Sequence, residues 1–98
     1  MPTYITVRRV RGPAWNVSLP MRAQAQWAEH AAFMNGLVDD GFIVLGGPLA
    51  DEQRVAHVVE AESEGEVRSA FARDPWSGSH LVLESIDLWT IRLDARNA

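Results

Sequence analysis

The sequence predicts a ferredoxin-like α+β fold, in which a four-stranded antiparallel sheet carries two helices on one face. Its segments follow the order strand, helix, strand, strand, helix, strand, which is the βαββαβ order of that fold. The length of 98 residues suits a single domain spanning residues 1–98. Apolar residues on both parities of the last strand require a second cover, which a second sheet packed face to face would provide. We therefore expect a homodimeric α/β barrel.

The first strand is expected over residues 3–10, a β-branched and aromatic run whose apolar side chains alternate in period two. Residues 11–20 contain one Gly, two Pro, Ser and Asn, which break any period, although Trp15 lies among them. We expect this segment to be a loop with several apolar side chains.

The first helix is expected from Met21 to about Asp39, because the residues there are good helix formers and Gly41 can end the helix. Its apolar residues at helical spacing are Trp27, Ala31, Met34 and Val38, beside Phe33 and Leu37.

A second strand is expected at Phe42-Ile43-Val44-Leu45, with Gly46-Gly47-Pro48 as the turn that closes it. Residues 54–61 follow the polar turn at 51–53 and are expected to form a strand, with Val55, His57 and Val59 on one face and Arg54, Ala56, Val58 and Glu60 on the other. The two strands are expected to form a hairpin.

The second helix is expected to start after Ser63, because Glu66 follows it at the capping-box spacing. Asp74-Pro75 should stop this helix. Residues 80–93 are strand-like with apolar residues on both parities, and residues 94–98 are expected to form a loose tail.

Composition excludes several kinds of chemistry. The chain has no Cys, which removes disulfides, thiolate nucleophiles and Cys-based metal sites. All nine basic residues are Arg, so a Schiff-base lysine and a P-loop lysine are excluded. We expect no cofactor and no His/Asp metal site.

The net charge of −4 argues against capture of nucleic acid or of an anionic membrane, although Arg8, Arg9 and Arg11 form a local basic patch. No apolar run approaches the roughly 20 residues of a membrane helix, and the start lacks a signal-peptide pattern. We expect a cytoplasmic protein.

His30 and Asp74 are the candidate catalytic pair. His30 lies at the margin of the apolar face of the first helix, and Asp74 follows the second helix. Each has a plain alternative, a structural histidine and a turn aspartate. In the ferredoxin-like arrangement both helices lie side by side, so the two side chains can meet. A carboxylate then fixes the tautomer of the imidazole, which suits general acid or base work.

Other residues are candidates for binding a substrate. Glycines at Gly46-Gly47-Pro48 would let backbone amides approach an oxyanion, although a tight turn between strands is the more common reason for such glycines. Trp15 and Trp76 are candidate aromatic walls or ordinary packing residues, and Ser77 is a candidate ligand contact. His57 and His80 are interpreted as structural or interface residues.

These motifs, taken together and in order, resemble the YCII-related (YciI-like) proteins over nearly the whole chain. The resemblance rests on Trp27, His30, Phe33, Met34 and Leu37, on Gly41, on Leu45-Gly46-Gly47-Pro48-Leu49, on Asp74-Pro75-Trp76, and on Leu88-Trp89-Thr90-Ile91. It implies a dimeric ferredoxin-like α/β barrel with a catalytic His and Asp, which map onto His30 and Asp74. Relatives include muconolactone isomerase-like barrels and dehydrohalogenase-type activities in the breakdown of aromatic compounds.

The sequence departs from this family at residues 11–20, which are longer than the family pattern and carry Trp15. We expect this loop to cover the pocket as a lid, which would change the ligand that fits.

Three functions follow from these observations. The favoured one is a cofactor-independent enzyme of lyase or isomerase type, in which His30 and Asp74 transfer a proton on a small cyclic or aromatic-derived metabolite. The alternatives are a non-catalytic homodimer that binds or senses a small ligand, and an accessory protein whose dimer surface binds another protein.

Overall fold

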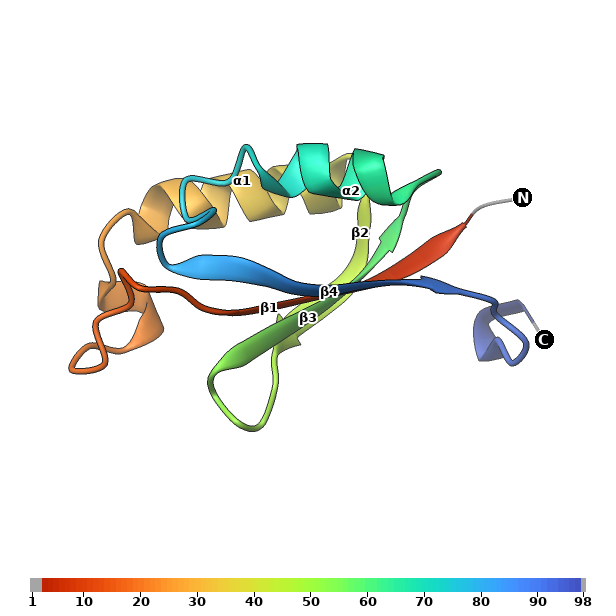
Figure 1. The fold of residues 1–98 in the computed structure, drawn as a ribbon. Coiled ribbons are helices and arrows are strands. Elements are labelled where there is room, and N and C mark those ends of the chain that lie inside the picture. Colours follow the sequence, from red (N-terminus) through yellow and green to blue (C-terminus); the bar gives the residue numbers. More distant parts are fainter. Residues whose placement is uncertain (1–2, 98) are drawn as a thin grey trace.

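The computed structural model describes residues 3–97 and contains one four-stranded sheet with two helices (Figure 1). The strands follow the order β2-β3-β1-β4, and each neighbouring pair is antiparallel. This arrangement confirms the predicted ferredoxin-like α+β fold. The elements are β1 (Tyr4–Arg11), a 3-10 helix (Met21–Ala23), α1 (Trp27–Asp39), β2 (Ile43–Pro48), β3 (Arg54–Glu60), α2 (Glu64–Phe71), β4 (Leu81–Trp89) and a 3-10 helix (Ala95–Asn97).

The helices α1 and α2 lie over the same face of the sheet, and no element of residues 3–97 covers the opposite face (Figure 1). The loop between β1 and α1 lies at one end of the sheet, and both chain termini lie at the other end (Figure 1). Neither helix is long and apolar enough to cross a membrane, as far as residues 3–97 show.

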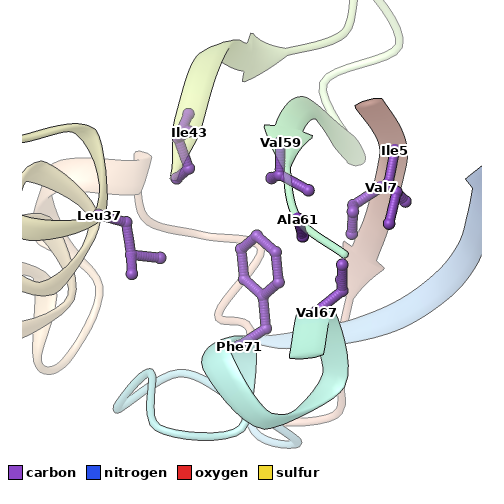
Figure 2. Close-up of a cluster of buried hydrophobic side chains, with 8 residues drawn as sticks. All are labelled: Ile5, Val7, Leu37, Ile43, Val59, Ala61, Val67 and Phe71. Carbon is purple, nitrogen blue, oxygen red and sulfur yellow. The ribbon is translucent and has the colours of Figure 1, made fainter. Parts of the chain in front are cut away.

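The hydrophobic core fills the layer between the helices and the sheet. Ile5 and Val7 of the central strand β1 are fully buried there, because successive side chains alternate between the two faces of a strand. Phe71 of α2 lies between Leu37 of α1 and the side chains of the sheet (Figure 2). The complete buried cluster is Ile5, Val7, Leu37, Ile43, Val59, Ala61, Val67 and Phe71.

The C-terminal end of α1 and the N-terminal end of α2 lie where the sequence predicts them. The Ser63 hydroxyl accepts a hydrogen bond from the Glu66 N–H at 3.1 Å, which caps the start of α2. Gly41 adopts a φ of +79°, and the N–H groups of Gly41 and Phe42 donate to the carbonyls of Val38 and Leu37. This Schellman motif satisfies carbonyls that the end of α1 would leave without partners.

The first helix begins later than predicted. A 3-10 turn occupies Met21–Ala23, and Gln26 has a φ of 62°, so regular α-helix starts only at Trp27. The buried Gln24 side chain bonds instead to the preceding loop, where it donates to the carbonyls of Asn16 and Leu19. These bonds hold the chain in a path that a continuous helix from Met21 could not follow.

The bounds of β2 and β4 also differ from the prediction. Residues Gly46-Gly47-Pro48 belong to β2 and are not the turn after it, since Pro48 pairs with Val55 of β3. Proline is tolerated because β2 is an edge strand. Strand β4 ends at Trp89, four residues before the predicted end, because its partner β1 begins at Tyr4, directly opposite Trp89.

The expected loose tail is partly folded. Residues 95–97 form a 3-10 turn, and the Arg96 guanidinium lies 5.5 Å from the centre of the Tyr4 ring. Asp94 accepts hydrogen bonds from the Arg96 backbone and side chain. Residue 98 lies outside the described residues.

Candidate active site

A cavity of about 450 Å³ opens at the end of the sheet that carries the loop between β1 and α1. This volume is typical of sites for small molecules. The strands supply Arg9, Gly46 and His57 to its wall, and α1 supplies Trp27, His30 and Met34. Trp15 and Trp76 complete an aromatic lining.

His30 and Asp74 are in direct contact across 44 positions of sequence. The His30 Nδ1 lies 2.8 Å from Oδ1 and 3.0 Å from Oδ2 of Asp74. Both residues are buried, with 7% and 3% of their surface exposed. Since a carboxylate only accepts hydrogen bonds, Nδ1 carries the proton that it donates to Asp74.

Asp74 has two further hydrogen-bond donors. The Trp76 backbone N–H donates to Oδ1 at 2.9 Å, and Nη1 of Arg9 donates to Oδ2 at 2.6 Å. Burial alone raises the pKa of Asp74, but the hydrogen bonds from His30, Trp76 and Arg9 hold that pKa below its ordinary value. The side chain of Asp74 is therefore a carboxylate near neutral pH.

Arg9 is a buried cation that contacts three elements. Its guanidinium lies 4.7 Å from the centre of the Phe71 ring, and Nη2 donates to the sulfur of Met34 at 3.4 Å. Burial lowers the pKa of Arg9, while the hydrogen bond and charge of Asp74 raise it, and the net shift is downward. The side chain is still charged, because arginine titrates far above neutral pH.

Trp76 forms the flat support of the His30 ring. The two rings are stacked with centroids 4.0 Å apart and planes 9° apart. The indole N–H of Trp76 donates to the Ala25 carbonyl at 2.8 Å, which fixes the ring beside the start of α1. His30 is therefore oriented by a carboxylate at Nδ1 and by an aromatic plane on one face.

The chain brings these groups together through two helix ends. His30 lies in the first turn of α1, at the end of the sheet where the cavity opens. Helix α2 ends at Phe71, and the N–H of Asp74 donates to the Phe71 carbonyl in the turn that follows. Asp74 then lies beside the start of α1, as expected for two helices on one face of a sheet.

The predicted binding residues divide into two groups. Gly46, Gly47, Pro48, Trp15 and Trp76 all line the cavity. Ser77, in contrast, is exposed and does not line it.

The loop at 11–20 contributes Arg11, Trp15 and Pro20 to the cavity wall. The middle of this loop is held by Gln24, whose Oε1 accepts a hydrogen bond from the Asn16 N–H at 2.9 Å. The loop therefore bounds the cavity in the position expected of a lid.

Sequence reasoning missed several residues of the cavity wall, among them the buried Arg9 and His57. The sequence suggests Arg9 only as a member of a local basic patch with Arg8 and Arg11, and His57 only as a structural or interface residue. The signal for both was strand parity, since Arg9 continues the buried side of Ile5 and Val7 and His57 shares the side of Val59. His80 is buried and stacks on Trp76 with centroids 5.0 Å apart, outside the cavity wall.

No group of three His, Asp or Glu side chains placed to hold a metal ion occurs among residues 3–97. No protein-family model matches the chain, and no curated protein is significantly similar to it. The function of the site is therefore inferred from its residues and their geometry.

Proposed function

We propose that this protein is a cofactor-independent enzyme of the YCII-related type, in which His30 transfers a proton on a small cyclic or aromatic-derived metabolite. The observation that carries the proposal is the contact of the His30 Nδ1 with Asp74 at 2.8 Å on the wall of a cavity.

The tautomer of His30 decides which nitrogen can act as a base. Because Nδ1 donates to Asp74, neutral His30 keeps its lone pair on Nε2. Among residues 3–97, Nε2 has no hydrogen-bond partner. A base of this kind is available to a ligand in the cavity, and the carboxylate stabilises the imidazolium that forms when Nε2 takes a proton.

The proposed step begins when Nε2 removes a proton from a carbon beside a carbonyl group, leaving the electron pair as an enolate. In an isomerisation, His30 returns the proton to a different carbon. In an elimination, the electron pair forms a carbon–carbon double bond and a halide or hydroxide leaves the adjacent carbon with its bonding electrons. Backbone amides near Gly46 and Gly47 are candidate donors to the enolate oxygen.

The aromatic lining favours planar ligands. The rings of Trp27 and Trp76 lie beside His30, and the Trp15 ring meets the Trp76 ring edge to face, with centroids 5.6 Å apart. Flat rings pack well against such walls, which suits a cyclic substrate.

The test is proton exchange with solvent. Unsaturated lactones, cyclic β-diketones and chlorohydroquinones would be incubated with the protein in heavy water, with deuterium uptake and chloride release as the readouts. His30→Ala should lower the rate about 10²- to 10⁴-fold, the usual contribution of a positioned general base. His80→Gln is the control, because it removes a buried imidazole that does not line the cavity. Equal rates in the wild type and His30→Ala would refute the enzyme; ligand binding without exchange would favour the ligand-binding homodimer.

We also propose that a second copy of the chain covers the sheet face opposite the helices. Leu45 and Trp89 lie on that face with 62% and 48% of their surface exposed, and Val58 of β3 pairs with Leu45 on the same face. Exposed apolar area of this kind is typical of an interface. Val58→Glu should convert a sedimenting dimer into a monomer, whereas Val38→Glu, at an exposed apolar position of α1, should leave the dimer intact.

A further inference from the structure

His57 enters the cavity wall from the sheet and not from the helices that carry His30 and Asp74. Its partners in the sheet are Val7 of β1 and Gly46 of β2. The residue is buried, with 8% of its surface exposed, and its ring centre lies 5.7 Å from that of Phe71. The same Phe71 ring supports the Arg9 guanidinium. Arg9 and His57 therefore lie near each other on the sheet side of the cavity, beneath its aromatic lining.

The imidazole of His57 has no hydrogen-bond partner among residues 3–97, and its Nδ1 is fully buried. Nearly all buried polar groups in proteins are hydrogen-bonded, and one without a partner costs about 1–3 kcal/mol. Val59, two positions further along the same face of β3, is fully buried and has no polar side-chain atom that needs a hydrogen bond. Packing therefore does not explain a histidine here.

The opposite strand makes room for this imidazole. A Cβ at Gly46 would lie 2.3 Å from Cδ2 of His57 and 3.0 Å from the Ala56 carbonyl oxygen. Any side chain at Gly46 would displace the ring from the cavity wall. The glycine and the histidine thus fit each other, and the unpartnered Nε of Arg9 lies on the neighbouring strand.

The charge state of His57 differs from that of a surface histidine. Burial, followed by the positive charge of Arg9, lowers the pKa of His57 to about 4. The ring is therefore neutral near pH 7 and presents one N–H donor and one lone pair. A neutral imidazole can donate a hydrogen bond to an oxygen atom without losing its proton.

We propose that His57 is a second functional histidine, whose Nε2–H, on the ring nitrogen that is not fully buried, binds a carbonyl, enolate or phenolate oxygen of the ligand beside Arg9. The substrate class is then a planar ring that bears such an oxygen. The oxygen is held from the sheet while His30 faces the ligand from α1. Binding of this oxygen by His57 does not depend on the proposed enzyme reaction. A gain of negative charge on the oxygen during proton transfer rests on that proposed function.

Binding of 4-nitrophenolate and nitrobenzene tests this assignment, because the two probes share a ring and differ in the phenolate oxygen. Calorimetry would compare the wild type with His57→Val, which matches the aliphatic residues of the strand. Loss of a hydrogen bond to a charged oxygen should weaken 4-nitrophenolate about 10- to 100-fold. Nitrobenzene affinity should change by less than about threefold.

A nitrogen NMR spectrum of the wild type provides a measurement that needs no variant. The His57 ring nitrogens should shift when 4-nitrophenolate is added and should not shift with nitrobenzene. The assignment is overturned by equal losses for both probes, by unchanged affinity in His57→Val, by no binding of the phenolate to the wild type, or by an unmoved His57 resonance.

The two proposals fail separately. In His30→Ala, binding of 4-nitrophenolate should persist while proton exchange is lost. If exchange survives in His30→Ala, the enzyme mechanism is wrong, yet the His57 binding result still stands. If His57→Val binds both probes as the wild type does while His30→Ala loses exchange, only the role of His57 is wrong.

Discussion

Arg9 and Asp74 form an ion pair that is shielded from water. Nη1 of Arg9 donates to Oδ2 of Asp74 at 2.6 Å, and the two side chains are 1% and 0% exposed. The pair joins the central strand to the turn after α2. The positive charge of Arg9 also neutralises the carboxylate that orients His30. Arg9, Asp74 and His30 therefore form one buried hydrogen-bonded network.

Arg9→Met should destabilise the fold by about 3–5 kcal/mol, because it leaves the Asp74 carboxylate buried without its cation. Urea unfolding followed by circular dichroism measures this loss. In the double variant with Asp74→Asn, part of the stability should return, because the uncompensated charge is gone. Strictly additive losses in the double variant would show that the two side chains do not interact.

Asp74→Asn should change the tautomer of His30. In the wild type the ring proton resides on Nδ1, and nitrogen NMR of the imidazole should show this single form. An amide holds the ring less selectively, so a mixture of Nδ1-H and Nε2-H forms is expected, with proton transfer about 10²- to 10⁴-fold slower. His80 in the same spectrum is the internal control and should be unchanged. An unaltered His30 spectrum would contradict the role assigned to Asp74.

The stability of the protein should depend on pH through His57. Its pKa is lowered to about 4 in the fold, whereas the unfolded chain has the ordinary value of about 6.5. Between these values the unfolded chain binds a proton that the native state rejects, so the free energy of unfolding falls as the pH falls through that window. Above it the contribution of His57 is constant.

The size of this effect is on the order of 3 kcal/mol at full depth. Urea unfolding of the wild type and His57→Val at about pH 7.5, 6 and 5 isolates it, because carboxylates contribute equally to both proteins. The free energy of unfolding of His57→Val, relative to that of the wild type, should increase as the pH is lowered. Parallel curves would mean that His57 is not held neutral by the fold.

Gln24→Ala should loosen the loop at 11–20. The Gln24 side chain makes hydrogen bonds to the backbone of Asn16 and Leu19, so its removal leaves those groups without partners. The Asn16 amide should lose protection against hydrogen exchange, and stability should fall by about 1–3 kcal/mol. Asn35→Ala, at an exposed amide on α1, should leave Asn16 protected. Unchanged protection in Gln24→Ala would show that other contacts hold the loop.

The order of the elements and most of their bounds followed from the sequence, because they depend on local signals. Alternation placed β1 and β3, the capping box placed the start of α2, and Gly41 placed the end of α1. The bounds that were predicted wrongly depend on partners outside the element itself. The start of α1 is delayed because Gln24 bonds to the backbone of Asn16, and β4 ends at Trp89 because its partner β1 begins at Tyr4. Neither effect can be recognised from the residues of the element itself.

The sequence by itself determined the fold class, and it suggested His30 and Asp74 as a pair, because the order of the helices in that fold brings the end of α2 beside the start of α1. Only the tertiary structure decided that His30 and Asp74 touch, that Arg9 completes their network, and that His57 lies beside Arg9 in the cavity wall. The physical reason is burial. The groups that surround a buried side chain decide whether it is charged, whether its nitrogens find partners and how much space it has. Those neighbours come from strands and turns that are far apart in the chain.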